Sequence, residues 1–203
     1  MSADAKLDLY KLHKSDYTAK RAPAIVDVAE ARYLAIDGRG EPGGPDFQSG
    51  IGALYGVAFT VKMTRKMAGR GDYAVCKLEA QWWHDGGDDL SRVPKSEWRW
   101  RMMIRTPDFV EPPELERAAR KLVEKNKGEA VSRVWLETIA EGRCVQVLHV
   151  GPYDREHETI EAMRAFAEER GLAFHGLHHE IYLSDPRRVE PSRLKTILRR
   201  PVR

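Results

Sequence analysis

The sequence predicts an α+β fold built from tandem strand-helix-strand-strand modules with pseudo-twofold symmetry. The modules are expected to form a mainly antiparallel sheet, with helices on one face and a ligand cleft on the other. Two observations support this fold class: segments with apolar residues at helical spacing alternate with runs rich in β-branched and aromatic residues, and the order strand, helix, strand, strand occurs twice. With 203 residues, 42% of them hydrophobic, the chain can bury a substantial core.

The first module is expected over about residues 30–110, after an N-terminal arm of residues 1–29 that shows no clear period. YLAID is expected to be a strand, and the turn-rich loop GRGEPGGPD, in which Asp46 can cap a helix, leads into a helix that ends near Met67. The runs AVCKLEAQWWHD and EWRWRMMIRTPDFV then predict two strands, paired as a hairpin with a long connection.

The second module is expected over about residues 131–203, after an amphipathic connecting helix over about 111–128. RVWLETIA and RCVQVLHVG are predicted strands on either side of an EG turn. A helix capped by Asp154 and ending at Gly171 follows, and the strand pair HGLHHEIYLSD and RLKTILRRPV closes the module.

The two modules align weakly but in a consistent order. Placing AQWWHD beside EIYLSD sets Trp82 against Tyr182 and Asp85 against Asp185. If each module buries its helix on one sheet face, the pair forms a pseudo-twofold domain with a shared cleft.

The charge balance and the hydropathy restrict the possible partners. The 34 Lys and Arg residues and 31 Asp and Glu residues are interspersed and leave a net charge of only +3, so direct nucleic-acid binding is not expected. No apolar run approaches the roughly 20 residues of a membrane-spanning helix, and the first residues do not form a signal peptide. Cys76 and Cys144 fit no paired or zinc-binding spacing. We therefore expect a soluble, cytoplasmic protein, and its oligomeric state stays open.

The carboxylate of Glu180 stands out within the strand-like run HHEIYL. Strand alternation places His178, Glu180 and Tyr182 on one face, and His179 and Ile181 on the other. The apolar set is expected to face the helices, which leaves Glu180 on the open side. There it is either an ordinary solvated charge, the more common case for a strand carboxylate, or a charge that meets a ligand.

The tryptophans favour the ligand interpretation of Glu180. All five, at 82, 83, 98, 100 and 135, lie in or beside predicted strands. Trp82 and Trp83 must point to opposite faces of a regular strand, whereas Trp98 and Trp100 share one. Packing in the hydrophobic core accounts for about half of these tryptophans. A cleft with Trp, Tyr and one Glu suits flat, apolar and often cationic ligands.

The candidate motifs for binding a cofactor or a metal ion do not have the required residue spacing. GIGALYG does not have the glycine spacing of a dinucleotide-binding loop and lies within a helical pattern. His175 and His178 point to opposite sides of a strand, and HHEIY lacks the second histidine of a zinc-protease helix. We expect neither a cofactor nor a metal ion.

Several motifs nevertheless resemble one known family. KLEAQWW, WRMMIRTPDFV, EGRCVQVLHVGPYDRE, HHEIYLSDPRRV and LKTILRRPV are similar to those of a stand-alone branch of the GyrI-like small-molecule-binding proteins. The resemblance runs from about Ala31 to the C-terminus. It implies a pair of strand-helix-strand-strand modules and a relationship to the effector-binding domains of multidrug-responsive transcription activators.

The resemblance also implies a site and a reaction. Glu180 matches the glutamate that accepts cationic drugs at the bottom of the related aromatic pockets. The branch with these motifs looks like hydrolases that open the cyclopropane ring of DNA-alkylating compounds of the yatakemycin and duocarmycin type. The chain reads EAQWW where the family often reads EGLWW, so Ala80 and Gln81 can alter the pocket depth and leave the substrate open.

On this basis Glu180 is expected to activate water, with its pKa raised by burial. Trp82 or Trp83 and Tyr182 are expected to stack on the ligand, and Tyr153 to donate to its developing negative charge. The predicted ligand-binding set is Trp82, Trp83, Tyr182, Trp100 and His178. The main alternative is a non-catalytic drug-binding or sequestering protein in which Glu180 is a counter-charge. A third reading, interaction with gyrase or another protein, rests only on the family's name.

Overall fold

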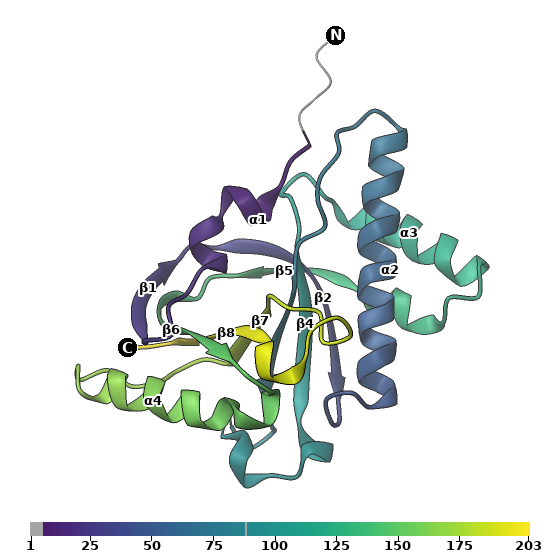
Figure 1. Ribbon diagram of the computed structural model, residues 1–203. Coiled ribbons are helices and arrows are strands. Elements are labelled where there is room, and N and C mark those ends of the chain that lie inside the picture. The colour runs from purple at the N-terminus through teal and green to yellow at the C-terminus, as the bar shows by residue number, and fades with distance from the viewer. Residues whose placement is uncertain (1–5, 88) are drawn as a thin grey trace.

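A computed structural model describes residues 6–87 and 89–203 and shows one curled sheet with helices packed on it (Figure 1). The strands are β1 (Ala24–Val28), β2 (Ala31–Arg39), β3 (Leu78–Trp83), β4 (Arg99–Arg105), β5 (Trp135–Ile139), β6 (Gly142–Val150), β7 (His178–Tyr182) and β8 (Lys195–Pro201). The α-helices are α1 (Leu9–Leu12), α2 (Pro45–Met67), α3 (Pro112–Glu124) and α4 (Glu156–Glu168). None of these helices is long and apolar enough to cross a membrane.

The sheet confirms the predicted α+β class and the tandem modules. Its strand order is β1-β6-β8-β7-β3-β4-β2-β5, and every pairing is antiparallel. Thus β2-α2-β3-β4 and β6-α4-β7-β8 are the two repeats, and they meet where β7 pairs with β3. Ala80 lies opposite Glu180 in that pairing, so the pseudo-twofold axis passes between these two residues.

Helix α2 forms because its apolar residues recur at helical spacing and because the residues at its N-terminus favour the start of a helix. Gly44 is the N-cap and Pro45 occupies the first helical position, where a missing N–H costs nothing. Asp46 therefore lies in the first turn and is not the cap that the sequence predicted, although the predicted end at Met67 is confirmed. The buried side of α2 packs on β2 and β4 and forms the largest core cluster.

Helix α4 begins later than the sequence predicted. Asp154 lies in a short 3-10 turn, Tyr153–Arg155, and the α-helix starts at Glu156. The side chain of His149 on β6 holds this turn, because its Nδ1 lies 2.8 Å from the Thr159 hydroxyl and its Nε2 lies 3.2 Å from the Pro152 carbonyl oxygen. These two contacts of the His149 ring hold the start of α4 against the sheet.

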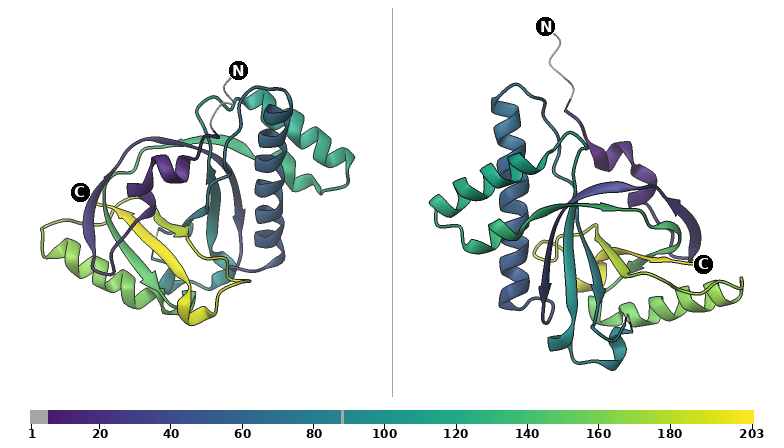
Figure 2. Two further views of the ribbon diagram at one scale, coloured as in Figure 1. Left: turned by 45° about the horizontal axis from the view of Figure 1, so that its top comes forward. Right: turned by 180° about the vertical axis from the view of Figure 1, so that it is seen from behind.

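The second face of the sheet is covered by the N-terminal arm. Tyr17 packs with Ile181 and Ile197, and its hydroxyl donates to Glu79 over 3.0 Å. The views from above and behind show α1 and the arm on the curled sheet, away from α4 (Figure 2). Both faces of the central strands are therefore buried.

Candidate active site

Glu180 lies on the sheet face that carries the helices, which corrects the predicted orientation. Its carboxyl lies within hydrogen-bonding reach of that of Glu156, the first residue of α4. Tyr182, on the same side of β7, packs against the core cluster that contains Leu54 of α2. The predicted alternation is correct, but His179 and not Glu180 faces away from the helices. Charged residues occupy the second face because the arm closes over them and supplies hydrogen-bond partners.

Hydrogen-bond donors surround the Glu180 carboxylate. His178 Nε2 lies 3.2 Å from Oε1, and the Tyr182 hydroxyl donates to Oε2 over 2.7 Å. Since an ionised carboxylate only accepts, His178 Nε2 must carry its proton. The Trp82 indole N–H donates in turn to the Tyr182 hydroxyl over 3.3 Å. The Glu180 side chain is only 12% exposed, so these bonds hold a mostly buried charge.

Glu156 is a site residue that the sequence did not reveal. It is 6% exposed, and its carboxyl meets that of Glu180. Burial, together with the neighbouring Glu180 charge, raises the pKa of Glu156 well above its usual range. Glu156 lies within the family-like segment EGRCVQVLHVGPYDRE, but only the packing of α4 against β7 brings it to Glu180.

The pKa of Glu180 is shifted opposite to the prediction. Desolvation alone would raise it, but the hydrogen bond and charge of His178 and the hydrogen bonds from Tyr182 and Glu156 outweigh desolvation and lower it. The prediction took only burial against aromatic rings into account, although His178 and Tyr182 share a strand face with Glu180. The donors come from both β7 and α4, and together they keep Glu180 ionised.

Tyr153 lies at the open side of the site. Its ring centroid is 6.0 Å from that of Tyr182, in an edge-to-face arrangement, and 40% of the residue is exposed. Burial of the rest and the charges of Glu156 and Glu180 raise the pKa of Tyr153 to about 12. The hydroxyl therefore stays protonated at neutral pH and remains a donor.

Trp82 supports the site from within the core. It is 3% exposed, stacks on Phe47 of α2 at 5.7 Å and meets Trp98 edge-on at 5.8 Å. Trp83 lies at the end of β3 opposite Arg99, on the other face from Trp82. Of the two adjacent tryptophans, the structure therefore brings Trp82 to Glu180.

Trp100 is a core residue rather than a ligand-facing one, which corrects its predicted place. It is fully buried and meets Phe47 edge-on. Its ring occupies the space beside Gly38 and Gly50, where a Cβ atom would lie 2.0 Å and 2.9 Å from Trp100 Cη2. The missing side chains of these two glycines leave room for the indole.

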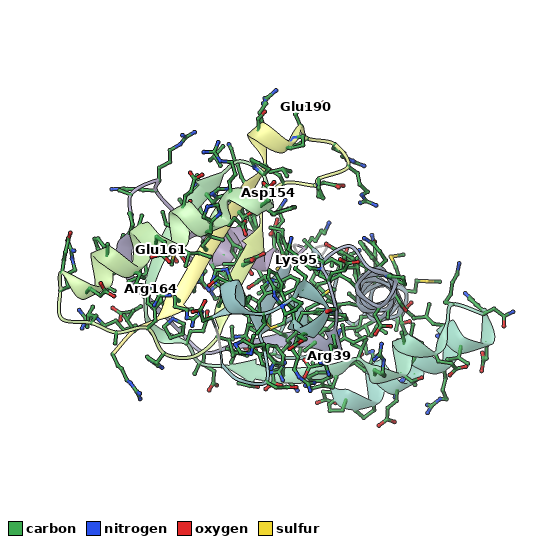
Figure 3. The ribbon with its side chains drawn as sticks, turned by 90° about the horizontal axis from the view of Figure 1, so that it is seen from below. Arg39, Lys95, Asp154, Glu161, Arg164 and Glu190 are labelled. Atoms are coloured by element: carbon green, nitrogen blue, oxygen red, sulfur yellow. The ribbon has the colours of Figure 1, made fainter. Side chains whose placement is uncertain are left out.

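The site lies between the two repeat helices. Seen from below, α4 and the end-on α2 stand on either side, with Asp154 and Lys95 between them and Glu190 on a projecting loop (Figure 3). An open groove of about 610 Å³ lies elsewhere, between α4, the β3–β4 connection and β8, and includes Glu161 and Arg164 in its lining. Among the described residues, no group of three or more His, Cys, Asp and Glu side chains is arranged to hold a metal ion.

Comparison with known proteins agrees with this architecture. Two solved structures from Listeria innocua, an uncharacterized conserved protein and a hydrolase, are 40% and 39% identical to this chain, with TM-scores of 0.90 and 0.86. In both cases the match covers 98% of this chain and 100% of the other. The EcmrR C-terminal domain is 13% identical with a TM-score of 0.57, over 89% of this chain and 96% of that domain, and shares the fold. The curated proteins gave no match. Because the profile of the GyrI-like small molecule binding domain matches residues 21–203, the chain belongs to the GyrI-like family, as its motifs predicted.

Proposed function

We propose that the protein binds planar aromatic small molecules at Glu180 and hydrolyses the cyclopropane ring of DNA-alkylating compounds of the yatakemycin and duocarmycin type. The observation that carries this proposal is an ionised, mostly buried glutamate beside two tyrosines. The similar Listeria innocua protein described as a hydrolase supports an enzymatic role. Such an activity would remove an electrophile before it reaches DNA.

The proposed reaction needs little beyond a well-placed water molecule. The water oxygen bonds to the ring methylene, the strained carbon–carbon bond breaks, and its electron pair enters the dienone to give a phenolate. Glu180 takes the proton from water and returns it to solvent, and solvent protonates the phenolate. A carboxylate offers about four acceptor positions, and His178, Tyr182 and Glu156 use three. The remaining position is available to orient and deprotonate the water.

The tyrosines have separate proposed tasks. Tyr153 is exposed enough to meet a ligand and donates to the charge that develops on the dienone oxygen. Tyr182 flanks the flat heterocycle and holds Glu180 in place. Trp82 is too buried to offer a free face, so its role is to orient the Tyr182 hydroxyl.

Replacing Glu180 by glutamine tests the proposal. We expect catalytic amounts of the native protein to convert an excess of a yatakemycin-type compound to its water adduct, followed by liquid chromatography and mass spectrometry. The Glu180→Gln variant should lose about 10²–10⁴-fold in rate, because the amide cannot accept the proton. Glu190→Gln changes an exposed glutamate of the loop after β7 and should leave the rate unchanged. Adduct formation by Glu180→Gln at the native rate would refute the assigned role.

A binding protein without chemistry is the second candidate, and one observation favours it. The lowered pKa of Glu180 weakens it as a base but suits it as a permanent counter-charge for a cation. A sequestering protein would remove ligand only up to its own molar amount. Product well in excess of protein therefore separates the enzyme from the binding protein.

A further inference from the structure

We propose that Glu156 is a positioning residue that holds one proton between itself and Glu180, so that the pair of carboxyls carries a single negative charge and the site functions only while Glu156 is protonated. This inference rests on the proposed function because it concerns the same carboxylate. It assigns Glu156 no contact with the substrate. Its effect passes through the hydrogen bond to Glu180.

The contact between the two carboxyls requires a proton. Two ionised carboxylates repel each other and have no hydrogen to share, whereas one protonated carboxyl can donate to the other. Glu156 is 6% exposed and the Glu180 side chain 12%, so water screens their repulsion poorly. Within residues 6–87 and 89–203, neither carboxyl forms an ion pair with a lysine or arginine that would neutralise a second charge.

The surroundings decide which of the two carboxyls keeps the proton. On β7, His178 and Tyr182 both donate to Glu180 and stabilise its ionised form. From the turn before α4, the neutral Tyr153 faces both carboxyls. Glu156 has Thr196 of β8 beside it and no cationic partner in the described part of the chain, so its ionisation is opposed by burial and by Glu180. The proton therefore belongs to Glu156, although the start of a helix would otherwise favour a negative charge there.

Ionisation of Glu156 would disable the site in two ways. Glu180 would lose a donor that helps to fix its carboxylate plane, and a second negative charge would oppose it at short range. A general base must keep its orientation toward the water, so the rate should fall on the alkaline side as Glu156 loses its proton.

The Glu156→Gln variant separates the effect of an ionisable proton at this position from the effect of the hydrogen bond to Glu180. In Glu156→Gln the amide still donates to Glu180 but cannot ionise, and Glu156→Leu removes the donor as well. We would record the carboxyl carbon resonances of ¹³C-glutamate-labelled protein from about pH 5 to about pH 10. One carboxyl should remain protonated at neutral pH in the native protein and be missing in Glu156→Gln. Spectra in which every glutamate is ionised at neutral pH would overturn the proposal.

The pH profile of the reaction supplies a readout that a merely structural residue would not change. The native rate should fall at alkaline pH, and Glu156→Gln should lose that alkaline limb while keeping most of the neutral rate. Glu156→Leu should lose about tenfold or more at every pH, because Glu180 is no longer held. Glu158→Gln, at an exposed position two residues along α4, serves as the matched control. An unchanged alkaline limb in Glu156→Gln would refute the assignment.

The two proposals can fail separately. The resonance titration uses no substrate, so a shared proton would still be observed if the alkylating compound were bound without conversion. In that case only the hydrolase proposal is lost. Conversely, turnover that depends on Glu180 but is accompanied by two ionised carboxyls would overturn only the role of Glu156.

Discussion

Neighbouring residues on β7 show how a single step along a strand separates two kinds of polar site. Glu180 faces the helices and a set of donors, whereas His179 faces the arm and is fully buried. His179 Nδ1 lies 2.9 Å from Glu141 Oε1, and its Nε2 lies 3.1 Å from Glu79 Oε2. Arg199 completes this second cluster with a 2.9 Å ion pair to Glu141.

The charge of His179 should make stability depend on pH. Desolvation would lower its pKa, but Glu141 and Glu79 outweigh it and raise the pKa from 6.5 to about 9. Because the folded value is the higher one, this contribution is complete below about pH 6.5 and is lost as the pH rises through about 9. We expect the free energy of unfolding to fall across this window by on the order of 3 kcal/mol.

Denaturant unfolding at a series of pH values checks this dependence. The His179→Gln variant should be less stable than the native protein at neutral pH and should show a flatter profile over the same window. His175→Gln, which lies outside this cluster, should keep the native profile. A profile of His179→Gln that parallels the native one would show that another group titrates.

At the scale of elements, the packing of α2 on the sheet depends on the large indole ring of Trp100 and on two glycines that leave room for it. Trp100 of β4 fits between Gly38 of β2 and Gly50 of α2. Phe47, one turn before Gly50, then contacts both Trp100 and Trp82. Through Phe47, helix α2 therefore helps to fix the position of Trp82, which supports the site.

Two glycines of α2 provide a matched test of this packing. Gly52 is exposed with open space around its Cα, so Gly52→Ala should stabilise the protein by about 0.5–1 kcal/mol through helix propensity. A Cβ at Gly50 would lie 2.9 Å from the rigid Trp100 ring, so Gly50→Ala should instead destabilise by about 1–3 kcal/mol. Thermal unfolding of both variants gives the comparison. Equal stabilisation would mean that the ring moves freely.

At the scale of the whole molecule, the N-terminal arm joins the two modules on the sheet face opposite the active site. Asp16 pairs with Arg105 of the first module over 2.7 Å, and its carbonyl oxygen accepts from Arg199 of the second over 2.7 Å. Tyr17 covers Ile181 and Ile197. The arm thus closes a charged layer that would otherwise meet water.

Removing the arm should loosen the central strands without removing any residue of the active site. We expect deletion of residues 2–20 to lower the free energy of unfolding and to speed amide hydrogen exchange in β7 and β8, because Ile181 and Ile197 lose their cover. Lys14→Ala, an exposed change within the arm, should leave exchange unchanged. Native protection of β7 in the truncated protein would contradict a stabilising role for the arm.

The sequence by itself determined the parts that depend on local pattern. Alternation and helical period are set by backbone geometry, so the repeated order of elements, the β3–β4 and β7–β8 pairings and the grouping of His178, Glu180 and Tyr182 could all be read from the residues. The family motifs added the importance of Glu180 as an expectation.

Only the tertiary structure decided what depends on contacts between distant segments. A strand's period says which residues share a face but not which face receives the helices, and that choice placed Glu180 beside α4. It also brought Trp82 rather than Trp83 to Glu180, placed Trp100 in the core and reversed the expected pKa shift of Glu180. A pKa reflects the sum of burial, charges and hydrogen bonds in three dimensions, and the donor from Glu156 reaches Glu180 only through packing.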